Sequence, residues 1–344
     1  LFVGALRNNI GYLDVIWHNK EWLKYSHPNS IRIKKLAFGK FTVSFCYGEE
    51  TTNENEEQRN WLKYLREQQN ENELDKIVIG IDRGVNVEVA TDKECLPFSE
   101  NSKCGLKKHQ KRIIRLQQKL AKQKDKKSKR RQKSKMRISK IHYKIANIRE
   151  NECHHITKKL VTSEHKVFIL EDLKVKNQTA SAKGTLANPG KNVTAKSGLN
   201  RSILNVSWSR IENQIKYKAI KFGKVVFKIN PAYTSQECAN CGHTHPHNRR
   251  GINFKCLECG HIDHADNNAA KIIKKRAVKL ILDSGTELSK NGTLVPFKGK
   301  GRGAKIRPKV EKSNLGISEK EIILKEASKK KRHLFKNAVE ARVL

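Results

Sequence analysis

The sequence predicts an α/β fold that also carries a basic helical hairpin and a metal-binding ribbon. Three observations lead to this prediction. Apolar strands end at acidic residues: "KIVIGIDRG" ends its strand at Asp82, and the strand in "HKVFILEDL" delivers Glu171. The chain between these strands is helical and basic, and two Cys-x-x-Cys pairs follow, fourteen residues apart. Buried strands that alternate with helices are typical of a sheet covered on both faces.

The chain before residue 76 divides into two parts. Residues 1–50 have strand character, and the alternation of apolar and polar residues over 31–45 around a Gly-containing turn predicts a β-hairpin. Residues 51–75 are polar around a short helical candidate and are interpreted as a linker. The main core is expected over 76–236, where a tight turn after Asp82 leads into a second strand through Val85, Val87 and Val89.

A basic helical hairpin is predicted over residues 104–149. Apolar residues recur there at three- and four-residue spacing on both sides of "KQKDKKSKRRQKSK", and Asp125 is the only acid between Lys103 and Lys144. We expect the bend to contact nucleic acid, and the alternative is an ordinary solvated hairpin. The residues selected for this contact are Lys126, Lys127, Lys129, Arg130 and Arg131.

The second half of the chain predicts a loop, helices and a strand. Residues 178–198 are rich in Gly, Ser, Thr and Lys and predict a mobile loop, and helical spacing returns over 203–215. "KVVFKIN" predicts a strand that leads into a ribbon over 237–262. A last core segment, 263–283, is expected to be helical to about its end. Residues 284–344 are expected to form a basic, disordered tail with one possible helix.

The charge indicates the kind of partner. The formal net charge is +38 and the isoelectric point is about 10.0. Lys and Arg gain affinity for phosphates by releasing condensed counterions, so a polyanion is expected, with a solvated basic surface as the alternative. No apolar run approaches the ~20 residues of a spanning helix. The chain is therefore expected to be soluble and cytoplasmic, beside nucleic acid.

The eight cysteines fall into two groups. Scattered Cys46, Cys95, Cys104 and Cys153 are interpreted as buried or free thiols. The clustered cysteines predict a tetrahedral zinc site, because soft thiolates suit Zn²⁺ and four of them fill its shell. A full shell leaves no place for a reactive water, so the zinc is expected to be structural. The predicted ligands are Cys238, Cys241, Cys256 and Cys259.

Three acids are the candidate catalytic residues. Asp82 and Glu171 follow apolar strands, and Asp266 stands at the start of a helix after the ribbon. Neighbouring strand ends lie about 5 Å apart, so these carboxylates are able to meet around Mg²⁺, which prefers oxygen ligands. Each acid alone has another interpretation as a turn residue, a solvated strand end or a helix cap.

The same residues resemble a known family. "IGIDRGV", "FILEDL", the ribbon and "HADNNAA" are similar to the three RuvC motifs and inserted zinc ribbon of the transposon-encoded TnpB (OrfB) proteins, relatives of the type V CRISPR effectors. The resemblance implies an RNase H-like (RuvC) core into which the helical hairpin and the zinc ribbon are inserted. It also implies a guide RNA, a DNA target cut in a two-metal reaction, and a monomer with its RNA. By motif match, Asp82, Glu171 and Asp266 take the places of the metal-binding acids.

One departure and two alternatives accompany the resemblance. Family members generally carry a longer N-terminal half with a wedge-like β-barrel, whereas only about 80 residues precede Asp82 here. The hairpin over 31–46 therefore resembles only the last part of that barrel. One alternative function is an RNA-guided DNA binder without useful cleavage, against which the presence of all three acids counts. The other is a cut-and-paste transposase, which typically ends its triad in Glu.

Overall fold

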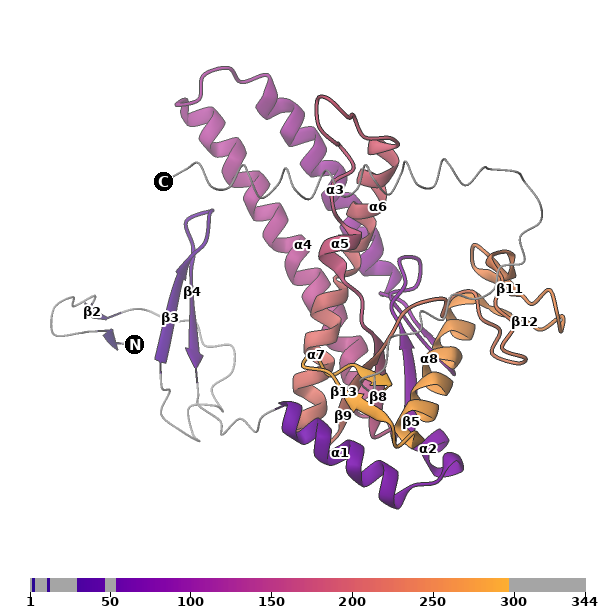
Figure 1. The fold of residues 1–344 in the computed structure, drawn as a ribbon. Helices are drawn as coiled ribbons and strands as arrows, with labels where there is room; N and C mark the ends of the chain where they lie inside the picture. Colours follow the sequence, from indigo (N-terminus) through magenta and orange to yellow (C-terminus); the bar gives the residue numbers. More distant parts are fainter. Residues whose placement is uncertain (1, 4–10, 13–29, 47–53, 297–344) are drawn as a thin grey trace, which may run out of the picture. The chain divides into compact units, whose positions relative to one another are not determined.

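A five-stranded sheet is the centre of the protein. In the computed structural model, which describes residues 2–3, 11–12, 30–46 and 54–296, its strands are β5 (Val78–Asp82), β6 (Val89–Thr91), β7 (Cys95–Leu96), β8 (Val167–Glu171) and β9 (Val225–Ile229). Their order is β7-β6-β5-β8-β9 (Figure 1). β5, β8 and β9 are parallel, whereas β6 pairs antiparallel with both β5 and β7. The predicted α/β class is confirmed.

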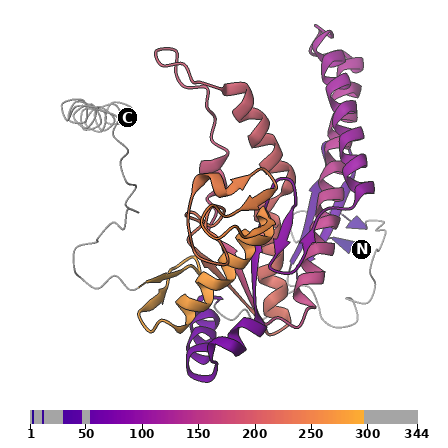
Figure 2. The ribbon, with the colours of Figure 1, turned by 90° about the vertical axis from the view of Figure 1, so that its right-hand side faces the viewer.

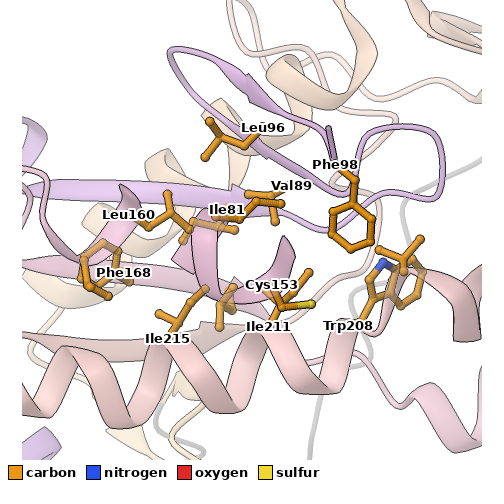
Figure 3. Packing of buried hydrophobic residues seen from close by; sticks show 14 of the residues in the cluster. Ile81, Val89, Leu96, Phe98, Cys153, Leu160, Phe168, Trp208, Ile211 and Ile215 are labelled. Carbon is orange, nitrogen blue, oxygen red and sulfur yellow. The ribbon is translucent and has the colours of Figure 1, made fainter. Parts of the chain in front are cut away.

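Helices cover both faces of this sheet. The described helices are α1 (Glu54–Gln68), α2 (Glu71–Ile77), α3 (Glu100–Ala121), α4 (Lys129–Val161), α5 (Val175–Gln178), α6 (Val193–Val206), α7 (Trp208–Lys221) and α8 (Ala265–Leu282). Side chains alternate along β5, so that Ile79 and Ile81 join a core with α4 and α7, and Val78 joins a core with α1 and α8. Figure 3 shows the first of these cores, where Ile211 and Ile215 of α7 pack near Phe168 of β8.

The predicted basic hairpin is present as α3 and α4, which lie side by side in both ribbon views (Figures 1 and 2). Ser99 and Ser128 cap their N-termini, each accepting a backbone N–H three residues on. The apolar stripes pack as expected, with Ile113, Ile141 and Ile145 buried. α4 continues twelve residues past the predicted end at Arg149, to Val161, because Ile156, Leu160 and Val161 extend the buried stripe.

Small antiparallel sheets accompany the core. They are β1 (Phe2–Val3) with β2 (Gly11–Tyr12), β3 (Ser30–Lys35) with β4 (Phe41–Cys46), the ribbon strands β10 (Arg249–Arg250), β11 (Asn253–Lys255) and β12 (Ile262–His264), and β13 (Thr286–Leu288) with β14 (Leu294–Pro296). The predicted hairpin over 31–45 is confirmed, with Ile33 opposite Val43. None of the described helices is long and apolar enough to cross a membrane.

Three expectations differ from the structure. The linker expected over 51–75 holds α1 and most of α2 within its described part, because Leu62, Leu65 and Leu74 bury their side chains in the core. The loop expected over 178–198 ends earlier, where α6 begins at Val193. The tail expected from residue 284 begins with the β13–β14 hairpin, whose Leu294 is buried. Its remainder, 297–344, with the possible helix, lies outside the described residues.

The strand expected through Val85, Val87 and Val89 is wrong over its first part. β6 begins only at Val89, and the preceding residues form a bend. The backbone packs closely around Gly84 here, since a Cβ at this residue would come within 2.6 Å of the Val87 carbonyl oxygen. The first two of these valines therefore lie in a tight turn beside Asp82, and the strand pairing begins only after this turn.

Gly80 allows α8 to lie directly against β5. A Cβ at this position would come within 2.1 Å of the Ala270 carbonyl oxygen and 2.8 Å of the Lys274 nitrogen, both backbone atoms of α8. Gly80→Ala is expected to destabilise the protein by about 1–3 kcal/mol or more, because the helix must move away from the sheet. Thermal unfolding followed by circular dichroism measures the loss.

Gly198→Ala is the matched control for Gly80→Ala. Gly198 lies within α6, and a Cβ there would meet nothing within 4 Å. The added methyl is expected to stabilise the helix by roughly 0.5–1 kcal/mol, since Ala loses less backbone entropy than Gly. Equal melting temperatures for Gly80→Ala and the unmodified protein would contradict the close packing of α8.

Candidate functional site

The structure places the three predicted acids on neighbouring elements. Asp82 ends β5 and Glu171 ends β8, and these strands are parallel partners with Ile81 opposite Leu170. Asp266 is the second residue of α8, the helix that packs against β5. All three side chains are buried, in residues that are 9%, 6% and 3% exposed, respectively.

Their electrostatics show that the carboxyl groups interact. Burial, together with the nearby charges of Glu171 and Asp266, raises the pKa of Asp82 to about 8, although Arg249 and Arg83 oppose the shift. Burial also raises the pKa of Glu171, against the hydrogen bond that it accepts from the Thr234 hydroxyl at 2.5 Å. Buried like charges are costly unless a cation compensates them. A divalent cation would supply that compensation.

An arginine of the ribbon reaches into this site. Arg249 in β10 donates from Nη2 to Oδ1 of Asp266 at 2.7 Å. It also lines a cleft of about 400 Å³ together with Asp82, Glu171 and Thr234. Asp266 does not line this cleft, whereas its partner Arg249 does. Arg249 is not among the residues predicted from the sequence. Its only signal there is a pair of arginines inside the ribbon, between the second and third acids.

The acids do not form a compact ligand cluster like that of the cysteines. Among the residues that the structure describes, only the four cysteines bring three or more ligand atoms within 4.8 Å of one another. The carboxylates suit Mg²⁺ by donor chemistry, since hard oxygen ligands are what it prefers. Asp82, Glu171 and Asp266 would hold it after the ion pair between Arg249 and Asp266 is broken.

The zinc prediction fits the geometry of the ribbon. The sulfur atoms of Cys238 and Cys259 lie 3.7 Å apart, and those of Cys241 and Cys256 lie 3.5 Å apart. A tetrahedron of sulfurs about 2.3 Å from zinc has edges of about 3.8 Å, so the four thiols form a possible zinc site. Gly242 and Gly260 follow the second cysteine of each pair with φ of 77° and 71°, which favours glycine.

The ribbon is tied to the helix that carries Asp266. Phe254 of β11 is buried with Cys238, Cys256 and Ala265, the first residue of α8. The side chain of Asn268 accepts from the Ala239 N–H at 3.0 Å and donates to the Glu237 carbonyl at 2.7 Å. The ribbon is therefore connected to the first turn of α8 by both packing and hydrogen bonds.

The predicted basic contacts at the hairpin bend divide into two kinds. Lys126, Lys127, Lys129 and Arg130 are exposed. Arg131 is half-buried, and its Nη1 donates to the carbonyl oxygens of Leu120 and Gln123 at 2.7 and 2.5 Å. Arg131 thus closes the C-terminal end of α3, where a cation is favourable for the helix dipole. The other four side chains are available to a partner.

Two family models match the chain. One, described as a probable transposase of the OrfB type, matches residues 54–182, and the other, described as a Cas12f1-like TNB domain, matches residues 208–273. Together they cover more than half of the chain. The first model includes Asp82 and Glu171, and the second includes the ribbon and Asp266.

Curated relatives agree with these models. The chain is 43% identical over 197 residues to the putative RNA-guided DNA endonuclease InsQ of Escherichia coli, covering 57% of this chain and 48% of that protein. It is 43% identical over 74 residues to the CRISPR-associated endodeoxyribonuclease Cas12f1 of Sulfoacidibacillus thermotolerans, covering 21% of this chain and 18% of the relative. The chain thus spans about half the length of InsQ.

A solved complex of Cas12f1 with its guide RNA and target DNA matches 59% of this chain and 50% of that one, at 19% identity and a TM-score of 0.39. The family models and the curated relatives rest on sequence, and the models cover the segments that carry the acids and the cysteines. On these grounds the chain belongs to the transposon-encoded TnpB (OrfB) family.

Proposed function

We propose that this chain is an RNA-guided, Mg²⁺-dependent DNA endonuclease of a transposon. The observation that carries the proposal is the group of three buried acids, Asp82, Glu171 and Asp266, of which Asp82 has a pKa of about 8 without a compensating cation. Such a group is costly to fold and is expected where a divalent cation binds. The named activities of InsQ and Cas12f1 support the same function.

The sheet supports an RNase H-like core. Its order β7-β6-β5-β8-β9, with antiparallel β6 and parallel β5, β8 and β9, is the arrangement that this fold class requires. Asp82 and Glu171 lie at the ends of the neighbouring parallel strands β5 and β8, where open α/β sheets generally bind their ligands, and Asp266 lies in the first turn of α8. The α3–α4 hairpin and the ribbon enter this core as insertions after β7 and β9.

The chain's own groups have distinct roles in the proposed reaction. Bound Mg²⁺ ions would activate a water and stabilise the leaving oxygen of a phosphodiester. The carboxylates of Asp82, Glu171 and Asp266 would hold the cations, and the Thr234 hydroxyl orients Glu171. Arg249 lines the cleft and is placed to meet a phosphate when it leaves Asp266.

The experiment that tests the proposal starts with the RNA. The protein is purified from cells that carry its transposon, the copurifying RNA is sequenced, and the complex is incubated with a supercoiled plasmid in Mg²⁺. Linear product that depends on the guide sequence supports the endonuclease. Guide-dependent binding without nicks would favour the RNA-guided binder, and strand joining without RNA would favour a cut-and-paste transposase.

The exposed bend of the α3–α4 hairpin is the proposed nucleic-acid contact. Neutralising Lys126, Lys127, Lys129 and Arg130 together is expected to weaken binding and to flatten its salt dependence. The log–log slope is expected to fall by about 0.9 per lost contact to a duplex phosphate, or about 0.7 for a single strand. Gel-shift titrations at several salt concentrations measure the slope.

Arg131 provides the control for that variant. Its guanidinium is committed to the carbonyls at the end of α3, so Arg131→Gln is expected to lower the melting temperature and to leave the salt slope unchanged. An unchanged slope in the fourfold variant would make the bend a solvated surface, as in the alternative interpretation of its charge.

A further inference from the structure

One buried arginine joins the two strand ends that carry the candidate acids. Arg83 directly follows Asp82, and its side chain is 1% exposed. Nη2 donates to the backbone carbonyl of Glu171 at 2.6 Å, and Nη1 donates to Oε2 of Glu212 at 2.8 Å. A single guanidinium therefore connects the end of β5, the end of β8 and the helix α7.

Glu212 is held from its other side as well. Its Oε1 lies 2.5 Å from Nζ of Lys228 in β9, and that Nζ is 3.8 Å from Oδ1 of Asp172. Burial raises the pKa of Glu212, but Arg83 and Lys228 together bring it below its usual range, so this carboxylate is charged. The cluster contains two cations and two carboxylates, and its charges balance.

The first turn of α7 also fixes the turn after Asp82. The Trp208 indole Nε1 donates to the Gly84 carbonyl at 2.9 Å, and the Trp208 carbonyl accepts from Arg83 Nη1 at 3.5 Å. Figure 3 shows Trp208 packed in the same core as Ile211 and Ile215, the next apolar residues of α7. The turn is thus held by a helix that is itself embedded in the core.

We propose that Arg83 is a positioning residue of the nuclease site, anchored by Glu212, and that it sets the separation of the Asp82 and Glu171 carboxylates. The inference rests on the proposed function. Arg83 is buried, and it reaches the site through its hydrogen bond to the Glu171 backbone and through its chain neighbour Asp82, while its positive charge also acts on both carboxylates. Reaction rates are sensitive to such placement, since an error of about 1 Å costs roughly 100-fold.

Two substitutions separate the effect of the Arg83 hydrogen bonds from the effect of its positive charge. Arg83→Met removes both the charge and the hydrogen bonds of the guanidinium, whereas Arg83→Lys keeps the charge but cannot reproduce the planar fork. Glu212 keeps Lys228 in both variants, so no carboxylate is left without a partner. If only the positive charge near the acids mattered, Lys would restore the rate.

The measurement combines cleavage with metal binding. Single-turnover cleavage of a guide-matched plasmid is recorded at saturating Mg²⁺, and Mn²⁺ binding to the same RNA complexes is followed by electron paramagnetic resonance. Arg83→Met is expected to cut about 100-fold more slowly, with target binding and Mn²⁺ affinity close to the unmodified protein and an altered Mn²⁺ spectrum. Arg83→Lys is expected to recover only a small part of the lost rate.

Gln214→Leu is the matched control on the same helix. Gln214 is buried, but its amide bonds to Thr157 and Glu150 of α4 and not to the acids. It is expected to lower the melting temperature and to leave the cleavage rate and the Mn²⁺ spectrum unchanged. Loss of rate in this control equal to that of Arg83→Met would show a general effect of loosened packing and would overturn the proposal.

Other outcomes are equally decisive. An unchanged rate in Arg83→Met, a full recovery in Arg83→Lys, or loss of Mn²⁺ binding together with the rate would each overturn the positioning role. If the unmodified complex cuts no DNA, the proposed function fails by itself. The Mn²⁺ spectrum then decides the inference, since identical spectra for Arg83→Met and the unmodified protein would show that Arg83 does not set the site.

Discussion

Asp82→Asn is expected to abolish DNA cleavage in Mg²⁺ while guide RNA and target binding remain close to those of the unmodified protein. The amide keeps the size of the side chain but loses the charge that attracts the cation, and it cannot bridge two cations. Binding depends mainly on Lys and Arg at the surface and is not expected to change. Glu171→Gln and Asp266→Asn are expected to behave in the same way.

Plasmid nicking and linearisation, run beside a gel shift on the same preparations, measure both properties. Asp172→Asn is a useful control, because Asp172 follows Glu171 directly but forms its ion pair with Lys228, at 3.8 Å. It is expected to retain cleavage. Robust cutting by any of the three acid variants would remove that residue from the active site.

Asp82→Asn is also expected to stabilise the protein in EDTA. The pKa of folded Asp82 is raised to about 8, far above the ordinary range of an aspartate, so the folded state holds a proton that the unfolded state releases. The stability contribution of this group is fully present below about pH 4 and is lost as the pH rises through 8. The melting temperature of Asp82→Asn should therefore exceed that of the unmodified protein more at pH 8 than at pH 5. Equal differences at the two pH values would contradict the buried, proton-holding carboxyl.

Cys256→Ser is expected to release zinc and to unfold the ribbon. Metal binding supplies much of the folding free energy of such modules, ~10 kcal/mol or more in isolated fingers. Because the ribbon also supplies Arg249 and packs on the first turn of α8, cleavage is expected to fall with the zinc. Elemental analysis of the purified protein gives the zinc content.

Cys104→Ser is the control for the ribbon variant. Cys104 is exposed in α3 and is not part of the four-cysteine group. It is expected to retain one zinc per chain. A well-folded unmodified protein without zinc, or a Cys256→Ser variant that keeps its full zinc content, would refute the structural zinc site.

The sequence was sufficient for features that are local in the chain. The sequence placed Asp82 and Glu171 at the ends of buried strands, which the structure shows, and the two cysteine pairs in one cluster that could hold a metal ion. The helical hairpin followed from its apolar period. In each case, the physical requirement falls on residues a few positions apart.

The features that the sequence did not predict depend on distant partners. Arg249 was missed because its role comes from an ion pair with Asp266 that forms only when β10 and α8 meet. Arg131 looked like its basic neighbours, yet its side chain caps α3. Val85 and Val87 alternate like a strand, but the close approach of Gly84 to Val87 makes a turn. Composition cannot distinguish a surface cation from one that closes a helix.

The contact of Gly80 with Ala270 also determines when the protein is able to fold during synthesis. The two residues lie 190 positions apart, and α8 follows the ribbon in the chain. The part of β5 that α8 covers therefore stays exposed on the ribosome until the cysteines have emerged and been able to take up zinc. Contacts between such distant residues slow folding and leave apolar surface exposed in intermediates. Zinc supply during translation is thus expected to govern the yield of soluble protein, as well as the metal content of the finished chain.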